Sequence, residues 1–156
     1  MLHYLIMFLI SMVPLVELRG SMFYAAGYDL PFYIALPICV VGNMLPVPLI
    51  YFFARRVLKW GADKKYIGKV FAFFLVKGER AGQKLVKATG RGGLIVALLL
   101  FVGIPIPGTG AWTGTLGASF LNMGFKSTVF AVCMGVILAG IITAIFGTAV
   151  FSFFGG

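Results

Sequence analysis

Long uncharged runs, separated by short polar or proline-rich segments, dominate the pattern of the chain. Four such runs cover residues 2–16, 31–54, 92–125 and 127–154. A helix that crosses a bilayer needs about 20 consecutive apolar residues. The second and fourth runs are each long enough for one span. The first run is too short to cross, and the third is too long for one span but too short for two spans with a loop.

The third run contains a helix-breaking segment at its centre. Its midpoint falls at Gly108, with Pro105 and Pro107 before it and Gly110 after it. Proline inside a helix removes a hydrogen-bond donor and clashes with the preceding turn, so a continuous helix is disfavoured here. We therefore expect a re-entrant hairpin, in which one half-helix enters the membrane, turns at PIPGTG and returns to the same side.

The first run repeats this plan. Its apolar segment stops before Glu17, the polar break PLVELRG follows, and the chain returns toward Asp29. The order is then hairpin, span, basic segment, hairpin, span. The two halves have opposite orientations, as in the inverted repeats of many secondary transporters. The predicted fold is an all-α integral membrane protein, one domain over residues 1–156, with a first repeat at 1–57 and a second at 92–156.

Composition and charge support this membrane assignment. Hydrophobic residues make up 61% of the 156 residues and charged residues only 11%, whereas a soluble domain is about one quarter charged. Thirteen Lys and Arg and four acids give a net charge of +9, and eleven of these cations lie within residues 55–91. Cations clustered beside apolar spans mark the cytoplasmic side, so nucleic-acid binding is disfavoured. We expect a multi-pass protein of the prokaryotic inner membrane.

The segment between the two repeats, residues 58–91, is predicted to form a cytoplasmic amphipathic helix. Its cations recur at three- and four-residue steps, which places them on one helix face. These residues are Lys77, Arg80, Lys84, Lys87 and Arg91. Such a face would contact anionic lipid headgroups at the membrane surface. The alternative is that these charges only orient the protein in the membrane.

Glu17 and Arg19 are ionisable residues at the expected tip of the first hairpin, next to Gly20. At membrane depth an ionised group is costly unless it is paired or hydrated. The two could form a salt bridge that holds the turn, or they could line a water-filled cavity and bind protons or substrate. Intramembrane ionisable residues are most often functional, so we favour the second interpretation.

The second tip carries no charge but many polar groups. The returning half-helix would present unpaired N–H groups and the positive end of its dipole, which favour an anion. Glycine also lets a backbone approach a ligand closely. The candidate binding residues are Pro105, Pro107, Gly108, Thr109, Gly110, Trp112 and Thr113. The alternative is that these residues only cap and anchor the half-helix.

The two spans add a polar candidate and a packing feature. Asn43 lies beside Pro46 and Pro48, and its amide would bond either the backbone groups freed by these prolines or a hairpin tip. Small residues recur at every fourth position of the last span, which favours close helix packing in a membrane. They are Ala131, Gly135, Ala139, Thr143 and Gly147.

At these segments the chain resembles the small multidrug export protein family. The motifs PLVELRG, GNMLPVP and LLLFVGIPIPGTGAWTGTLGASF occur in this order, with a basic linker between the last two. Phe23 stands where the family usually has proline. More distantly, two re-entrant hairpins with a carboxylate at one tip resemble the DedA membrane proteins. That resemblance implies transport of polyprenyl phosphates or other lipids, although the DedA second-hairpin arginines are not matched here.

The sequence leaves three functions open. The first is a proton- or ion-coupled secondary transporter of an amphipathic substrate, such as an anionic polyprenyl phosphate, bound between the two tips. The second is a proton-coupled exporter of small cationic drugs, and the third is a non-transporting membrane scaffold. An enzyme is not expected, since no nucleophile–base pair or metal-binding cluster is present in the sequence. We expect no cofactor or metal, membrane lipids as partners, and a homodimer that shields the half-helix tips from lipid.

Overall fold

The structure, a computed structural model, describes residues 1–14, 16–64, 68–106 and 109–154, and the regular elements within them are helices. They are α1 (Leu2–Met12), α2 (Glu17–Gly27), α3 (Phe32–Met44), α4 (Pro46–Ala62), α5 (Gly68–Gly103), α6 (Ala111–Phe120) and α7 (Phe125–Phe154). In this part of the chain, the apolar stretches long enough to cross a membrane are Phe32–Ala62 and Phe125–Phe146. For the described residues, the prediction of a helical protein with two apolar stretches long enough to span a membrane is confirmed.

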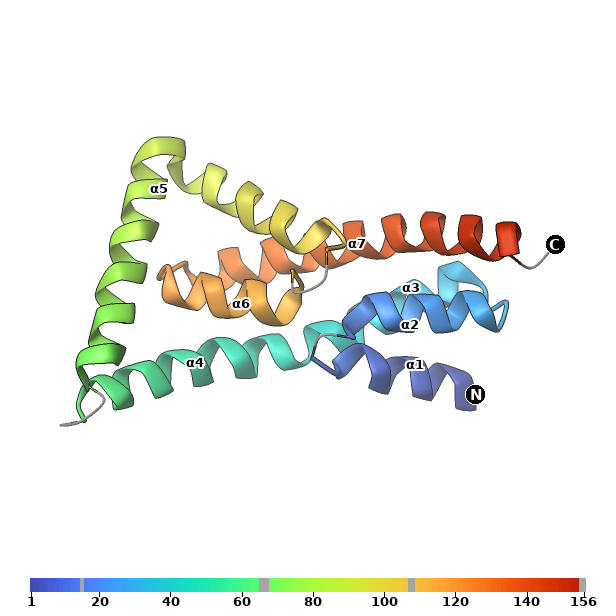
Figure 1. Cartoon of the computed structure of the whole chain (residues 1–156), viewed down its shortest axis with the longest axis horizontal. Coiled ribbons are helices and arrows are strands. Elements are labelled where there is room, and N and C mark those ends of the chain that lie inside the picture. Colours follow the sequence, from blue (N-terminus) through green and yellow to red (C-terminus); the bar gives the residue numbers. More distant parts are fainter. Residues whose placement is uncertain (15, 65–67, 107–108, 155–156) are drawn as a thin grey trace.

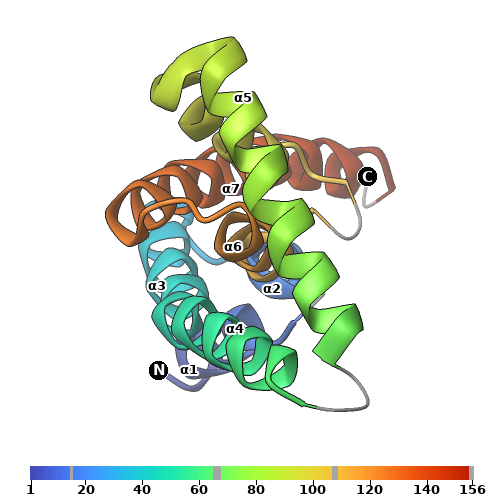
Figure 2. The same ribbon diagram turned by 90° about the vertical axis from the view of Figure 1, so that its left-hand side faces the viewer.

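The helices form an elongated bundle in which two long elements run in opposite directions. α3 and α4 together follow the length of the molecule, and α7 returns along it (Figure 1). α1 and α2 lie at the end that holds both termini, whereas α6 lies in the other half. The first part of α5 crosses that other end at a steep angle to α4, as the view in Figure 2 shows. The break between α1 and α2 and the break between α5 and α6 both lie near the middle of the molecule (Figure 1).

The first long element continues further than its uncharged run predicts. α3 and α4 join at Leu45, whose backbone is helical, and α4 ends at Ala62 instead of at residue 54. Pro46 occupies the first position of α4, where the missing N–H of proline costs least. Arg55 and Arg56 end the uncharged run, but arginine is a good helix former, so the charge does not stop the helix.

α5 bends at Gly90, which separates its basic first part from its apolar second part. The backbone there has φ +71° and ψ 174°, outside the helical region. A residue with a β-carbon adopts a positive φ only at a cost, whereas glycine adopts it readily. The bend lies one residue before Arg91, the expected end of the basic segment. Gly90 therefore sets the angle at which the basic part of α5 leaves the bundle.

Replacing Gly90 with alanine should destabilise the protein, while the same change at Gly92 should not. Nothing lies within 4 Å of a β-carbon built at either position, so the two differ in the backbone angle rather than in available space. We expect Gly90→Ala to lower the free energy of unfolding by about 1 kcal/mol and Gly92→Ala to leave it unchanged or raise it slightly. Thermal unfolding of the purified variants in detergent, followed by tryptophan fluorescence, measures both. Equal stability of the two variants would contradict the assigned bend.

α7 forms the centre of the packing, and its small residues face the other helices. Among the residues of the predicted ridge, Ala131, Gly135, Ala139 and Thr143 are buried. A β-carbon at Gly135 would lie 2.8 Å from the backbone oxygen of Leu99 on α5. The ridge therefore packs against other helices of the same chain. The surroundings of Gly147, the last member of the ridge, lie outside the described part of the structure.

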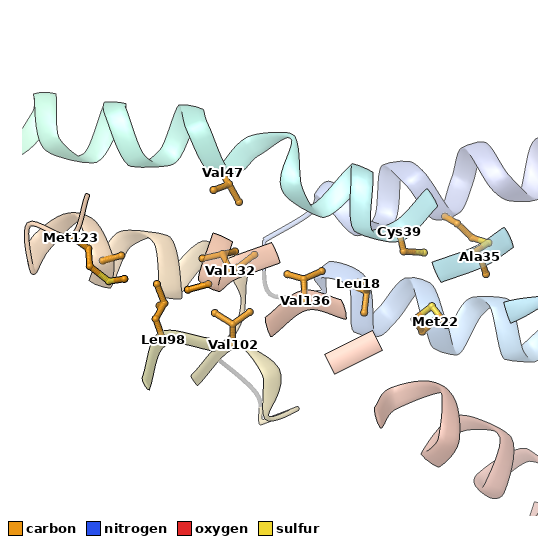
Figure 3. Close-up of a cluster of buried hydrophobic side chains, with 14 of the residues drawn as sticks. Leu18, Met22, Ala35, Cys39, Val47, Leu98, Val102, Met123, Val132 and Val136 are labelled. Atoms are coloured by element: carbon orange, nitrogen blue, oxygen red, sulfur yellow. The ribbon is translucent and has the colours of Figure 1, made fainter. Parts of the chain in front are cut away.

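The apolar core runs along α7 and connects the two halves. Val132 and Val136 of α7 lie near Val102 of α5, and the buried cluster continues to Leu18 and Met22 of α2 (Figure 3). All five side chains are at most 4% exposed. This packing holds the start of α2 and the end of α5 against the same helix. It therefore brings the two breaks together.

Candidate functional site

Glu17 of the first break caps a helix that lies 94 positions later in the sequence. Its carboxylate accepts hydrogen bonds from the backbone N–H of Ala111, at 3.2 Å, and of Trp112, at 3.1 Å. These are the first two residues of α6, whose N–H groups have no acceptor within the helix. Glu17 is only 6% exposed. The anion that the sequence predicted at this helix end is thus supplied by the protein itself.

Arg19 binds the other side of the second break, at the end of α5. Its guanidinium donates to the backbone oxygens of Val102 and Ile104, at 3.4 and 3.1 Å, and also to those of Ile106 and Thr109. A further hydrogen bond of 3.2 Å reaches the hydroxyl oxygen of Thr109. The Thr109 hydroxyl in turn donates to the oxygens of Ile104 and Ile106. The guanidinium therefore forms hydrogen bonds with several carbonyl groups at and just after the end of α5.

The charges of Glu17 and Arg19 are opposite in sign to the partial charges of the helix ends that they contact at the second break. Glu17 lies at the N-terminus of α6, which carries partial positive charge, and Arg19 lies at the C-terminus of α5, which carries partial negative charge. The two side chains thus bind the second break rather than pairing with each other in a hydrogen bond. We call this arrangement, formed by Glu17, Arg19 and residues 102–106 and 109–112, the tip crossing.

Strained backbone accompanies the tip crossing. Glu17 has φ +51°, in the left-handed region. A residue other than glycine in this region costs about 1–3 kcal/mol, and such residues cluster at ligand-binding and switching sites. The surrounding contacts hold Glu17 in this conformation. The strain marks the crossing as a candidate functional site.

Gly110 is needed for close approach rather than for its backbone angle. Its φ of −137° is ordinary extended backbone, but a β-carbon at this position would overlap the Glu17 carboxylate. The N–H of Gly110 is itself bonded to the Thr113 hydroxyl, at 2.9 Å. Glu17 can therefore reach the N–H groups of α6 only because residue 110 has no side chain.

Gly110→Ala should displace the Glu17 carboxylate from α6, and Gly117→Ala is its matched control. A β-carbon at Gly117 meets nothing within 4 Å. We expect Gly110→Ala to lower the free energy of unfolding by about 2 kcal/mol, because hydrogen bonds to a charged group contribute about 1.5–3 kcal/mol. Gly117→Ala should be neutral or slightly stabilising. Thermal unfolding in detergent compares them, and an unaffected Gly110→Ala protein would show that the Glu17 contact is unimportant.

A cavity of about 570 Å³ lies beside the tip crossing, between α2, the end of α5 and α7. Its lining residues are Val16, Arg19, Gly20, Phe23, Pro105, Thr143 and Phe146. Arg19 is the charged group of this lining, and most of the remaining surface is apolar. Thr143 is 4% exposed, and its hydroxyl has no hydrogen-bond partner in the described structure. The cavity is thus lined by one cation and an apolar wall, and the unpartnered Thr143 hydroxyl is buried beside it.

The structure brings most of the predicted site residues to this region. Glu17, Arg19, Thr109, Gly110 and Trp112 take part in the crossing, Thr113 bonds the N–H of Gly110, and Gly20 and Pro105 line the cavity. Asn43 is 1% exposed, and its side-chain oxygen has no hydrogen-bond partner in the described part of the chain. The expected partners of the Asn43 amide, the backbone groups freed by the prolines or a hairpin tip, stay a prediction. Pro107 and Gly108 lie outside the described residues.

Four lining residues of the cavity were not among the predicted site residues. Val16 and Phe146 are apolar residues in an apolar chain and carried no signal, and Phe23 was noted only as a departure from the family pattern. Thr143 was assigned to the small-residue ridge and so to packing, but it also lines the cavity.

The predicted cationic face lies away from the tip crossing, on the basic part of α5. Arg80, Lys84, Lys87 and Arg91 are exposed, and the surroundings of Lys77 lie outside the described part. The first part of α5, which carries most of them, crosses the end of the molecule (Figure 2). These residues therefore do not contribute to the central cavity.

Comparison with known proteins yields one family. The model of a family described as "Putative small multi-drug export protein" matches residues 17–142. No curated protein and no solved structure matches the chain. The match begins at Glu17, the first residue of α2, and includes the break between α5 and α6, the whole of α2 to α6 and most of α7. It therefore covers every residue of the tip crossing.

Proposed function

We propose that this chain, which belongs to the small multi-drug export protein family, is a small secondary transporter whose substrate binds beside the tip crossing. The family description names export, and the two apolar candidate spans are those of a membrane protein. The observation that carries the proposal is the crossing itself. Glu17 is buried and Arg19 is half-buried, and both connect the start of α2 to the break between α5 and α6, next to a cavity. Secondary transporters place their substrate sites at such interrupted helices.

In this proposal the pairs α1–α2 and α5–α6 are re-entrant hairpins of an inverted repeat. The two long elements run the length of the molecule, so the membrane normal follows its long axis. The cation-rich end that carries the first part of α5 then faces the cytoplasm. The two breaks fall near the midplane, with α1–α2 entering from outside and α5–α6 from the cytoplasm. Irregular backbone at that depth is tolerated where it is buried or lines a cavity.

Single cysteines should report this topology in a background with Cys39 and Cys133 replaced by alanine. Asp29, Arg91 and Lys126 are exposed, so a cysteine at each position can react. We expect an impermeant maleimide to label position 29 from outside intact cells, and positions 91 and 126 only after the cytoplasm is opened. Labelling of 91 and 126 from opposite sides would make α5–α6 a full crossing and would contradict the inverted repeat.

The charge of the cavity favours an anionic amphipathic substrate. Arg19 lines the cavity, whereas Glu17 is held away from it at the N-terminus of α6. A lipid phosphate would place its headgroup near Arg19 and its tail along the apolar wall. A polyprenyl phosphate fits this description. A cationic drug is the second candidate, and its recognition would require Glu17 to leave α6.

We extend the proposal to proton coupling through Glu17. The carboxylate holds α6 through two charge-assisted hydrogen bonds, which are about twice as strong as neutral ones. Protonation would remove this charge and weaken the crossing. Deprotonation would restore it. A proton gradient could thus open and close the contact between the two hairpins.

Transport by the purified protein in liposomes tests the proposal. Under an imposed proton gradient we expect translocation of a fluorescent polyprenyl phosphate analogue and no uptake of a cationic dye. Empty liposomes and the same protein without a gradient are the controls. Uptake of the dye alone would favour the drug exporter. Movement of neither compound would favour the scaffold and contradict the transporter assignment.

A homodimer is proposed to cover the exposed part of the second break. Ile104, Pro105 and Ile106 are exposed there, and non-helical backbone at membrane depth must be shielded from lipid. A second copy of the chain would provide that cover. The mass of the protein in lipid nanodiscs distinguishes one copy from two.

A further inference from the structure

A second cleft lies at the basic end of the molecule, away from the tip crossing. It has a volume of about 520 Å³ and lies between α5 at its bend and the turn that joins α6 to α7. Its polar lining includes Gln83, Lys87, Arg91, Asn122 and Ser127. None of the described acids lines it. The lining therefore combines two cations with neutral hydrogen-bonding groups.

The bend at Gly90 brings the two cations to this cleft. Lys87 precedes the bend and Arg91 follows it, so they belong to the two differently directed parts of α5. Both side chains are exposed. A mobile ammonium and a planar guanidinium together offer several N–H donors from two directions, which suits a tetrahedral anion.

The N-terminus of α7 adds to the positive potential of the cleft. Gly124 and Ser127 line it, and the first hydrogen bond of α7 runs from the N–H of Thr128 to the oxygen of Gly124, at 2.9 Å. The preceding N–H groups of the helix therefore have no acceptor within it, and the helix dipole is positive here. A phosphate at such a helix end is favoured by both effects.

A third cation borders the same turn. Asn122 has φ +57°, and its side-chain oxygen accepts a hydrogen bond from the guanidinium of Arg55 on α4. Arg55 thus bonds the α6–α7 turn, whose residues line the cleft together with Lys87 and Arg91. This bond helps to hold the turn in place at the cleft.

We propose that this cleft binds the phosphate group of an anionic lipid of the cytoplasmic leaflet. Its inner wall is apolar, with Leu94 and Ile95 of α5 and Met123 of the turn, and would lie along the first methylene groups of the lipid. Free phosphate shares the recognised chemistry but cannot use that wall. The site is separate from the tip crossing and does not depend on transport there, whereas its place in the cytoplasmic leaflet rests on the topology proposed above.

Lipid retention by the purified protein tests this site, with a matched pair of variants. Lys87→Gln/Arg91→Gln removes both cations of the cleft. Arg80→Gln/Lys84→Gln removes two exposed cations of the same helix that do not line it. Each protein is reconstituted into vesicles of phosphatidylcholine with phosphatidylglycerol and extracted in mild detergent. Native mass spectrometry then counts the phosphatidylglycerol that remains bound, with and without added inorganic phosphate.

We expect the cleft variant to lose at least tenfold in phosphatidylglycerol retention and the control variant less than twofold. Displacement of the lipid by inorganic phosphate would show that the phosphate group carries the recognition, and resistance to it would show that the apolar wall contributes as well. Equal losses in both variants, with unchanged thermal stability, would mean non-specific attraction to a basic helix and would overturn the proposal.

Discussion

Glu17→Gln is expected to abolish gradient-driven transport while leaving the protein folded and inserted in the membrane. The amide keeps the size of the side chain but removes its charge, and its NH₂ group cannot accept a hydrogen bond from Ala111 or Trp112. Hydrogen bonds to a charged group contribute about 1.5–3 kcal/mol. We therefore expect the free energy of unfolding to fall by about 2 kcal/mol and flux to fall to the level of empty liposomes.

Asp29→Asn is the matched control for this variant. It makes the same change of charge at an exposed position after α2, where φ is +50°, a conformation that asparagine accepts. Flux and thermal stability of Asp29→Asn should equal those of the wild type. Normal flux in Glu17→Gln across a range of pH values would show that Glu17 is only structural. The proposed proton coupling would then be wrong.

Arg19→Ala is expected to weaken the binding of an anionic amphipathic substrate by at least tenfold. The change removes the charged group of the central cavity and also frees the carbonyl groups of Val102 and Ile104 from their donor. Loss of a charge-assisted contact of about 1.5–3 kcal/mol corresponds to a factor of roughly 10–150 in affinity. Arg19→Lys should restore little, because an ammonium cannot reproduce the planar fork that reaches several carbonyls.

Binding of a polyprenyl phosphate analogue, measured by fluorescence with the purified variants, provides the test for Arg19. Arg56→Ala, which removes an exposed cation of α4, is the control. Unchanged affinity in Arg19→Ala would place the substrate elsewhere. If a cationic dye instead binds Arg19→Ala better than the wild type and no longer binds Glu17→Gln, the substrate is a cationic drug.

The elements of this fold were predictable because their signals are local. Proline and glycine mark the second break, charged residues mark the first, and apolar runs mark the long helices. The ends of the helices were less predictable. α4 passes Arg55 and Arg56 because a helix tolerates cations near its end, and hydropathy does not report this. Gly90 bends α5 whereas Gly92 does not, and nothing in the sequence around these two close glycines shows which of them takes the positive φ.

The residues of the site were predictable, but their partners were not. Glu17 and Arg19 were identified because charge is rare in this chain, and Gly110 because it follows two prolines. That Glu17 would fill the anion site at the start of α6 required the relative position of residues 94 apart, which depends on packing against α7. Thr143 was assigned to packing because a small residue on a ridge gives no sign of an adjacent cavity.

A double-mutant cycle between Glu17→Gln and Gly110→Ala tests the central claim that Glu17 acts through the N-terminus of α6. Both single changes break the same contact, so their effects should not add. We predict that the unfolding free energy of the double variant equals that of the worse single variant, whereas the effects of Glu17→Gln and Gly117→Ala on the unfolding free energy add. Full additivity between Glu17→Gln and Gly110→Ala would contradict the tip crossing as the functional contact.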